Sequence, residues 1–268
     1  MANSNLSNLS KMRILITNDD SVHASGIKAL EKIANSITPD VWVVAPEVGQ
    51  SGKGFSVTFD DILRVKEISP RKFAVSGTPA DCVFLALGQI LKDKKPDLIL
   101  SGINHGSNIG DFIGLSGTVG ATFAAGSQNI KSIAVSQDFT GDTAPQKFPV
   151  IDYFLLGIVK KLLSFDWPEN VCMNVNFPDV PLEQVKGIRA ARQSHLDIDW
   201  HVFEKKDPVD HPYYWLRATY EAKKKKENEE SDMYLLENDK YITITPLQSR
   251  HEYNECLPAL KELFETNA

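Results

Sequence analysis

The strongest constraint on the fold is an alternation of short apolar runs with segments of helical periodicity. Residues 12–17 read MRILIT, a run of large apolar side chains typical of a buried strand. Residues 27–37 carry apolar side chains every three or four positions, as in an amphipathic helix, and residues 41–45 are again apolar. This order predicts a strand, a helix and a second, parallel strand.

The alternation continues to residue 163. Helices are expected at residues 82–91, 117–126 and 150–163, and strands at residues 97–100 and 132–135. Parallel strands joined by helices form a sheet that is covered on both faces. The sequence therefore predicts an α/β fold with a mostly parallel sheet and helices on both sides.

Beyond about Val180 the pattern changes. Strands are expected at residues 211–216 and 241–245, and a short helix at residues 256–264. Between the two strands, residues 223–230 read KKKKENEE, a charge run typical of a solvated loop or a hairpin tip. Because no linker or repeat separates this part, we expect it to be an appendage of the sheet domain.

Composition limits the function classes. The formal net charge of −6 argues against binding a nucleic-acid polymer through general electrostatics, because such binding needs a basic surface. The three cysteines have no paired spacing, which favours reduced thiols. The polar residues 1–11 lack the apolar stretch of a signal peptide, and no run is long enough to cross a bilayer. We expect a cytoplasmic protein without a membrane partner.

Polar residues follow the ends of the predicted strands, where ligands bind in open α/β sheets. Asp19 and Asp20 follow the first strand, and two carboxylates at a turn can hold a hard cation. The glycine-rich loop after a later strand contains Asn104 and Asn108, whose amide oxygens suit the same kind of cation. The alternatives are a turn that caps a helix for the aspartate pair, and a surface loop for the asparagines.

Ser116, Gly117 and Thr118 precede the predicted small-residue helix. Free N–H groups and hydroxyls at the start of a helix form an anion site that fits a phosphate. Ordinary capping of the helix by Ser or Thr is the alternative. His23 and His105 lie in the candidate loops and can serve as acid or base, although a lone loop histidine is more often a surface residue.

Familiar nucleotide and metal motifs are missing. Residues 47–54 lack the first glycine and the Ser/Thr of a P-loop, and no G-x-G-x-x-G follows the first strand. The His251–Glu252 pair lacks the second histidine of a zinc protease motif. A P-loop nucleotide-binding site, a nicotinamide enzyme and a zinc protease are therefore not indicated.

Seven segments, taken in order along nearly the whole chain, resemble the SurE family of survival proteins. This family comprises 5′(3′)-nucleotidases that are also described as stationary-phase acid phosphatases. The segments are ILITNDDSVHASGI, VVAPEVGQSG with Ser56 and Thr58 after it, VSGTPADCV, PDLILSGINHGSNIGD, SGTVGA, NVNFP and ITPLQ. Their joint occurrence at compatible spacing makes the resemblance specific.

The resemblance implies an architecture and an assembly. After a polar tail of residues 1–11, residues 12–190 are expected to form a Rossmann-like catalytic domain. Residues 191–268 are expected to form arms that exchange between subunits, which gives a homodimer or a tetramer. The charge run at residues 223–232 is unusual for the family's exchanged hairpin, so the resemblance is weakest there.

The resemblance also implies a site that binds one divalent cation per subunit, Mg²⁺ or Mn²⁺. The implied metal ligands are Asp19, Asp20, Ser51 and Asn104. Asn108 and the segment Ser116, Gly117 and Thr118 are expected close to the phosphate, and Asp19, Asp20 and Asn108 are expected to be catalytic. The family usually has glycine after the aspartate pair, whereas this chain has Ser21, which predicts a slightly different turn and a modest change in metal affinity.

The expected reaction is metal-dependent hydrolysis of nucleoside monophosphates to nucleoside and phosphate. Two nucleophiles remain open, a metal-activated water and the carboxylate of Asp19. Residues 77–81 are expected either to shape the nucleoside side of the pocket or to form a Pro-containing turn with Asp81 at a helix start. The alternative functions are a phosphatase of other small phosphoesters or short polyphosphate, and a catalytically silent nucleotide-binding module.

Overall fold

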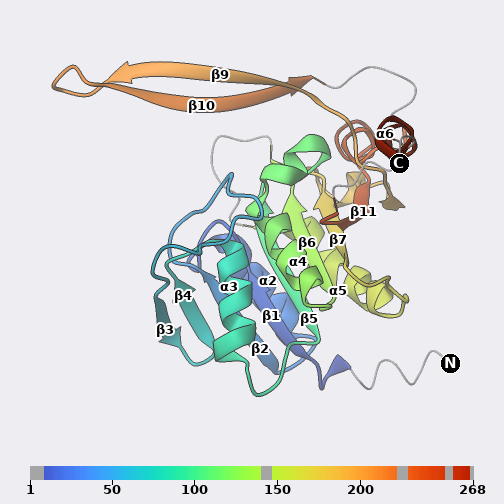
Figure 1. Cartoon of the computed structure of the whole chain (residues 1–268). Coiled ribbons are helices and arrows are strands. Elements are labelled where there is room, and N and C mark those ends of the chain that lie inside the picture. Colours follow the sequence, from blue (N-terminus) through green and yellow to red (C-terminus); the bar gives the residue numbers. More distant parts are fainter. Residues whose placement is uncertain (1–8, 140–146, 222–228, 251–255, 266–268) are drawn as a thin grey trace.

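The computed structural model describes residues 9–139, 147–221, 229–250 and 256–265. Its main sheet contains the strands β1 (Arg13–Thr17), β2 (Asp40–Pro46), β3 (Val65–Ser69), β4 (Lys72–Val75), β5 (Leu98–His105), β6 (Ser132–Gln137), β7 (Val171–Phe177), β8 (Ile188–Ala190) and β11 (Ile242–Gln248). Within the described residues, the strand order is β3-β4-β2-β1-β5-β6-β7-β11-β8 (Figure 1). The six neighbouring strands β4, β2, β1, β5, β6 and β7 run parallel to one another. Strand β3 runs antiparallel to β4, and β11 runs antiparallel to β7. The mostly parallel α/β sheet is confirmed.

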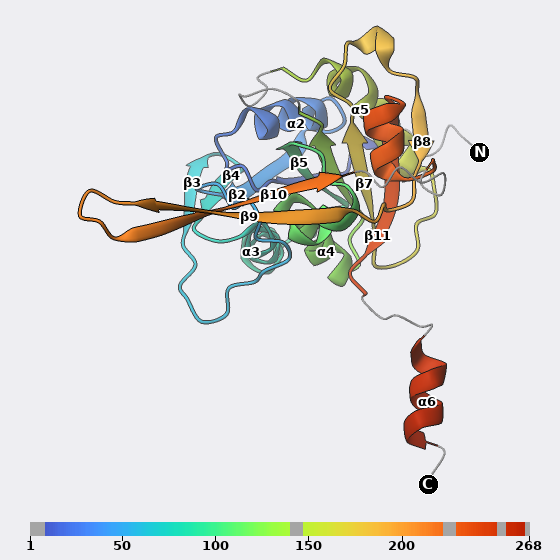
Figure 2. The same cartoon turned by 90° about the horizontal axis from the view of Figure 1, so that it is seen from above.

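Helices cover both faces of this sheet, as predicted. The main helices are α2 (Ser25–Asn35), α3 (Pro79–Leu85), α4 (Gly117–Ser127) and α5 (Pro149–Leu163), and the short ones are η1 (Ala86–Ile90), η2 (Gly110–Leu115), η3 (Leu182–Gln184) and η5 (Tyr234–Asn238). Figure 2 shows α2 and α5 on one face and α3 and α4 on the other. Two separate hydrophobic clusters fill the two interfaces.

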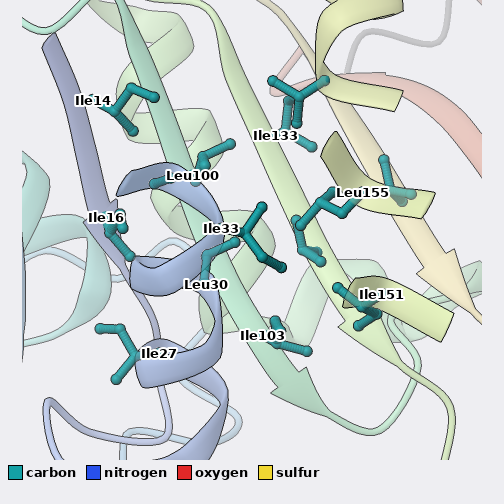
Figure 3. Packing of buried hydrophobic residues seen from close by; sticks show 14 of the residues in the cluster. Ile14, Ile16, Ile27, Leu30, Ile33, Leu100, Ile103, Ile133, Ile151 and Leu155 are labelled. Atoms are coloured by element: carbon teal, nitrogen blue, oxygen red, sulfur yellow. The ribbon is translucent and has the colours of Figure 1, made fainter. Parts of the chain in front are cut away.

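The packing of α2 explains why its periodicity could be read from the sequence. Ile27, Leu30 and Ile33 point at the sheet, where they meet side chains from β1 and β5 (Figure 3). Burying one such side chain contributes roughly 1.5–3 kcal/mol. Gly26 allows the close approach, because a Cβ there would lie 2.1 Å from the carbonyl oxygen of Ile103. The first turn of α2 is thereby held against the end of β5.

The C-terminal part contains a long hairpin and returns to the main sheet. Strands β9 (Asp197–Lys206) and β10 (Pro212–Glu221) form a separate two-stranded sheet that extends away from the body of the molecule (Figures 1 and 2). After it, β11 pairs with β7 and β8. The strands expected at residues 211–216 and 241–245 are thus confirmed as parts of β10 and β11.

The charge run does not form the tip of this hairpin. The turn lies between β9 and β10, where the Asp207 carboxylate accepts hydrogen bonds from the backbone N–H groups of Val209 and His211. Residues 223–228 of the charge run lie outside the described residues. The final helix is confirmed as α6 (Leu257–Glu265), with exposed side chains from Leu257 to Leu263.

All three cysteines are free thiols, with Cys82 and Cys172 buried and Cys256 exposed. Among the described residues, no helix has the length and apolar character needed to span a membrane.

Candidate active site

The sequence-predicted residues gather where β1, β2 and β5 end and α4 begins. Because β5 pairs directly with β1, the loop at the end of β5 lies beside the aspartate pair that follows β1. Asp19 is 4% exposed, and Asp20 is half-buried. The first strand of the fold therefore delivers two adjacent carboxylates to the ligand-binding edge of the sheet.

Asp19 joins three segments that are far apart in the sequence. Its Oδ1 accepts a hydrogen bond of 2.6 Å from the Thr118 hydroxyl, and its backbone oxygen accepts one of 2.7 Å from the Gln50 N–H. Gly117 lets the start of α4 approach, because a Cβ there would lie 2.8 Å from the Asp19 Cβ and 3.1 Å from Pro79 Cγ. The turn that contains Asp19 is thus packed against the loop after β2 and against the start of α4.

Asp20 faces the loop at the end of β5 through His105. The His105 backbone N–H donates to Asp20 Oδ2 at 3.3 Å, and the ring nitrogen Nδ1 lies 3.8 Å from the same oxygen. His105 is half-buried, and burial lowers its pKa, against a smaller opposing effect from Asp19. The His105 ring therefore lies next to the two carboxylates, in surroundings that favour its neutral form at neutral pH.

Both carboxylates are costly to ionise in the absence of a counter-ion. Burial raises the pKa of Asp19 to about 6; the hydrogen bond from Thr118 opposes the rise, and the neighbouring Asp20 adds to it. Burial also raises the pKa of Asp20, against the His105 backbone contact. A cation bound between two such groups would relieve both penalties.

The start of α4 uses two of its predicted phosphate ligands internally. Ser116 is the N-cap, and its hydroxyl accepts a hydrogen bond of 3.1 Å from the Val119 N–H. The Thr118 hydroxyl is committed to Asp19. The capping alternative therefore holds for the Ser116 side chain, which takes the Val119 N–H, so the anion-binding potential of this helix start resides in the backbone N–H groups before Val119.

Asn104 lies near the end of β5 and not in the predicted loop, Asn108 lies in the loop that follows, and the two differ in their surroundings. Asn104 is half-buried, and its Nδ2 donates to the Gly106 carbonyl at 2.8 Å, which makes Oδ1 the atom that can serve as a ligand. Asn108 is buried, and its Nδ2 donates to Ser136 Oγ at 2.8 Å. Its backbone is held by Asn174 and Asn176 of β7. The side chain of Asn108 is thus held by β6 and its backbone by β7.

Ser51 lies in the loop after β2, and its side chain is exposed. The loop is fixed on both sides of it: Gln50 binds the Asp19 carbonyl, and the Gly54 N–H donates to Leu115 at 2.9 Å. Ser51 therefore directly follows the residue whose backbone contacts Asp19. Sequence reasoning overlooked Gln50, whose backbone contact leaves no signature in residue type.

Asp81 has a structural role. Its carboxylate closes a capping box with Thr78 at the start of α3, and it also accepts hydrogen bonds from the backbone and hydroxyl of Thr58. The alternative that placed Asp81 at a helix start is therefore confirmed. Pro79 remains beside Gly117, so residues 77–81 lie next to the candidate phosphate site.

The donor set fits Mg²⁺ or Mn²⁺ better than a softer metal. Two buried carboxylates with neighbouring amide and hydroxyl oxygens are the ligand types that hard cations prefer. Among the described residues, no group of three or more His, Cys, Asp or Glu could hold a metal. A zinc site built from several nitrogen and sulfur ligands is accordingly not present in that part of the chain.

Comparison with known proteins shows similarity to one protein family along almost the whole chain. A family model described as "Survival protein SurE" matches residues 14–199. A protein named 5′-nucleotidase SurE from Parvibaculum lavamentivorans is 42% identical over 259 residues, which span 96% of this chain and 92% of that protein. Another with the same name, from Paramagnetospirillum magneticum, is 44% identical over 209 residues, or 78% of this chain and 80% of that protein.

A solved structure extends the similarity to the fold. The crystal structure of the SurE protein from Aquifex aeolicus superimposes with a TM-score of 0.77 at 36% sequence identity. The match covers 94% of this chain and 99% of that one. The overall architecture is therefore shared with this solved structure.

Proposed function

The chain belongs to the SurE family, and on that basis we propose that it is a metal-dependent 5′-nucleotidase. It hydrolyses nucleoside monophosphates to nucleoside and inorganic phosphate, in the cytoplasm. The observation that carries the proposal is the junction of Asp19 with Thr118 and of Asp20 with His105, because it sets two buried carboxylates beside a helix start. Curated relatives at 40% to 44% identity are named 5′-nucleotidases.

The proposed metal ligands are Asp19, Asp20, Ser51 and Asn104, for one Mg²⁺ or Mn²⁺ per subunit. When bound, the cation supplies Lewis-acid polarisation of the phosphoryl group and lowers the pKa of a bound water. The raised pKa values of Asp19 and Asp20 support this assignment, because both carboxylates are stabilised by a positive charge.

The proposed phosphate site consists of Asn108, Ser116, Gly117 and Thr118. Since the side chains of Ser116 and Thr118 have partners, the phosphate is bound mainly by backbone N–H groups at the start of α4. These donors are fixed before substrate arrives, which is the arrangement that stabilises developing negative charge. Asn108 is proposed as a catalytic residue at the same edge.

Water is the nucleophile that the geometry of Asp19 favours. Direct attack by Asp19 would use a carboxylate that is almost fully buried and hydrogen-bonded to Thr118. In the water route, a water oxygen bonds to phosphorus, the ester P–O bond breaks, and the leaving oxygen takes up a proton. A phosphorylated Asp19, trapped by acid quenching of a single turnover with radiolabelled AMP, would contradict this assignment.

The hairpin supports the proposed subunit exchange by residues 191–268. Tyr214 and Leu216 lie on one face of β10 and Tyr213 and Trp215 on the other, because side chains alternate along a strand. All four are exposed; Trp215 and Leu216 are 59% and 65% exposed. A two-stranded ribbon that is apolar on both faces needs cover from another surface. A second subunit supplies it in a homodimer or tetramer.

A substrate panel tests the proposed activity. Purified protein is assayed for phosphate release from AMP, GMP, 3′-AMP, glucose 6-phosphate and short polyphosphate, with Mg²⁺ or Mn²⁺. The proposal predicts the highest kcat/KM for a nucleoside monophosphate. Faster turnover of polyphosphate or a sugar phosphate would favour the broader phosphatase, and binding of AMP without turnover of any substrate would favour the silent binding module.

A further inference from the structure

A groove of about 800 Å³ lies beside the candidate active site, on the α2 and α5 face of the sheet. It is lined by His23, Ala24, Ser25, Lys28, Ala29, Lys32, His105, Lys147, Phe148, Pro149 and Asp152. We call it the basic groove. None of its residues except His105 takes part in the site described above.

The charge of the basic groove differs in sign from that of the chain. Lys28, Lys32 and Lys147 are exposed and face a single acidic lining residue, Asp152, whereas the whole chain carries a formal charge of −6. Among the described residues, none of the three lysines forms an ion pair. The carboxylate of Glu31, on the same helix, is taken by Lys72 at 2.7 Å. The groove therefore holds cationic groups that a bound anion can neutralise.

His105 joins the basic groove to the metal site. Its backbone N–H contacts Asp20, while its ring lines the groove, where Nε2 lies 3.3 Å from Ser25 Oγ and the ring stacks on Phe148. From Ser25 to Lys32 the helix rises about 10 Å. His105 thus contacts Asp20 and lines the same groove as Lys28 and Lys32, which places the groove next to the carboxylates.

The other lining residues indicate what the body of such a ligand is. Ala24, Ala29, Phe148 and Pro149 give the groove an apolar wall alongside its cationic groups. A purely anionic chain would gain nothing from that wall, whereas a nucleoside has an apolar ring and carries phosphates at two positions. We propose that the basic groove binds the second phosphate of a nucleoside bisphosphate. This inference rests on the proposed nucleotidase function.

The reaction differs from that on a monophosphate only in its product. Water attacks the phosphorus at the proposed phosphate site beside Asp19 and Asp20, the ester P–O bond breaks, and the released ribose oxygen takes up a proton that the water gives up. The products are inorganic phosphate and a nucleoside monophosphate whose remaining phosphate is the one bound by the lysines. No oxidant or further reactant is needed.

The test compares adenosine 3′,5′-bisphosphate with AMP in three proteins. These are the wild type, the variant Lys28→Gln/Lys32→Gln, and the control Lys160→Gln/Lys161→Gln. The control removes the same charge from exposed lysines at the other end of α5. Two readouts are taken: steady-state kinetics with Mg²⁺, and calorimetric binding of both nucleotides to Asp20→Asn proteins, in which turnover is suppressed.

The proposal predicts that the wild type has a lower KM for the bisphosphate than for AMP. The Lys28/Lys32 variant should raise the KM and the Kd for the bisphosphate roughly tenfold, since two exposed ion pairs are lost, and leave those for AMP unchanged. The control should change neither. Equal KM values for the two nucleotides in the wild type, or equal effects of the variant on both, would overturn it.

The calorimetry separates this inference from the proposed function. If AMP is not hydrolysed but the bisphosphate binds tightly and loses affinity in the lysine variant, the nucleotidase proposal fails and the groove assignment stands. If AMP is hydrolysed and the lysine variant leaves the KM and the Kd for the bisphosphate unchanged, the groove assignment fails and the nucleotidase proposal stands.

Discussion

Ser21 adopts a backbone conformation that favours glycine. Its φ of 106° lies in the region that L side chains rarely occupy, directly after the Asp19–Asp20 pair. The turn is held by the Asn18 side chain, whose Nδ2 donates to the Ser21 carbonyl at 2.9 Å. The site thus keeps a turn suited to glycine at the position where the family usually has one, and the serine carries backbone strain.

Replacing Ser21 with glycine should therefore stabilise the protein. We expect Ser21→Gly to raise the free energy of unfolding by about 1 kcal/mol, because relief of strain exceeds the added entropy of the unfolded chain. Chemical denaturation measures it. Ser36→Gly is the matched control, since Ser36 has a φ of −77° and the same change should destabilise. A lower midpoint for Ser21→Gly would contradict this account.

The residue scale also shows the limit of sequence reasoning about the site. Asp19, Asp20, Asn104 and Thr118 follow strand ends or begin a helix, so their convergence could be predicted from the order of elements. That the Thr118 hydroxyl would bind Asp19 and not a phosphate could not, because the close approach depends on the packing of α4. The roles of all these residues, and of Ser51 and Asn108, in metal binding and catalysis stay predictions.

At the scale of elements, the buried parallel strands were readable and the atypical strands were not. Strand β1 is a continuous apolar run, whereas β7 contains the buried polar residues Asn174 and Asn176, which bind the Asn108 backbone. Strands β3 and β9 are mostly exposed along their length and lack the one-sided alternation that identifies a half-buried strand. Because both faces of these strands are exposed, the pattern by which a strand is recognised from its sequence is missing.

The pairing of β1 with β2 is reinforced by an ion pair that makes stability depend on pH. Arg13 lies opposite Asp40 in the register, and its Nε donates to Asp40 Oδ2 at 3.0 Å. Burial tends to raise the pKa of Asp40, but hydrogen bonds from Arg13 and Trp42 outweigh it and hold the pKa below its usual value. A depressed pKa stabilises the fold above the unfolded pKa, and the stability is lost as pH falls through the folded value.

Asp40→Asn should accordingly cost about 1 kcal/mol at pH 7 and progressively less as the pH falls below 4. The measurement is the free energy of unfolding as a function of pH, with exposed Asp166→Asn as the control. If the two variants have parallel pH profiles, Asp40 does not act through its charge.

At the scale of the whole molecule, the β9–β10 hairpin is the part that most needs packing against another surface. Its strands are long, and aromatic and aliphatic side chains remain exposed on both faces. The sequence analysis predicted β10 but not its partner strand β9, so the extended hairpin came only through the family resemblance. Residues 242–248 return to the main sheet as β11, so the C-terminal third is tied to the catalytic core.

Polar substitutions on the hairpin should change the oligomeric state. We expect Trp215→Ser/Leu216→Ser to shift the particle mass toward the monomer, because both faces of β10 lose apolar area that a second subunit would cover. Light scattering coupled to gel filtration measures the mass. Lys205→Ser/Lys206→Ser, on the neighbouring strand, serves as the control. An unchanged mass in the Trp215/Leu216 variant, or a monomeric wild type, would exclude assembly through this hairpin.

The most direct test of the central claim is the dependence of AMP hydrolysis on Asp20 and on a divalent cation. Phosphate release is measured for the wild type, Asp20→Asn and the exposed control Asp60→Asn, each with Mg²⁺ or Mn²⁺ and again with EDTA. The account predicts loss of activity in EDTA, recovery on adding the metal, a decrease in kcat/KM of roughly a hundredfold or more in Asp20→Asn, and no change in Asp60→Asn. Full activity in EDTA, or in folded Asp20→Asn, would contradict it.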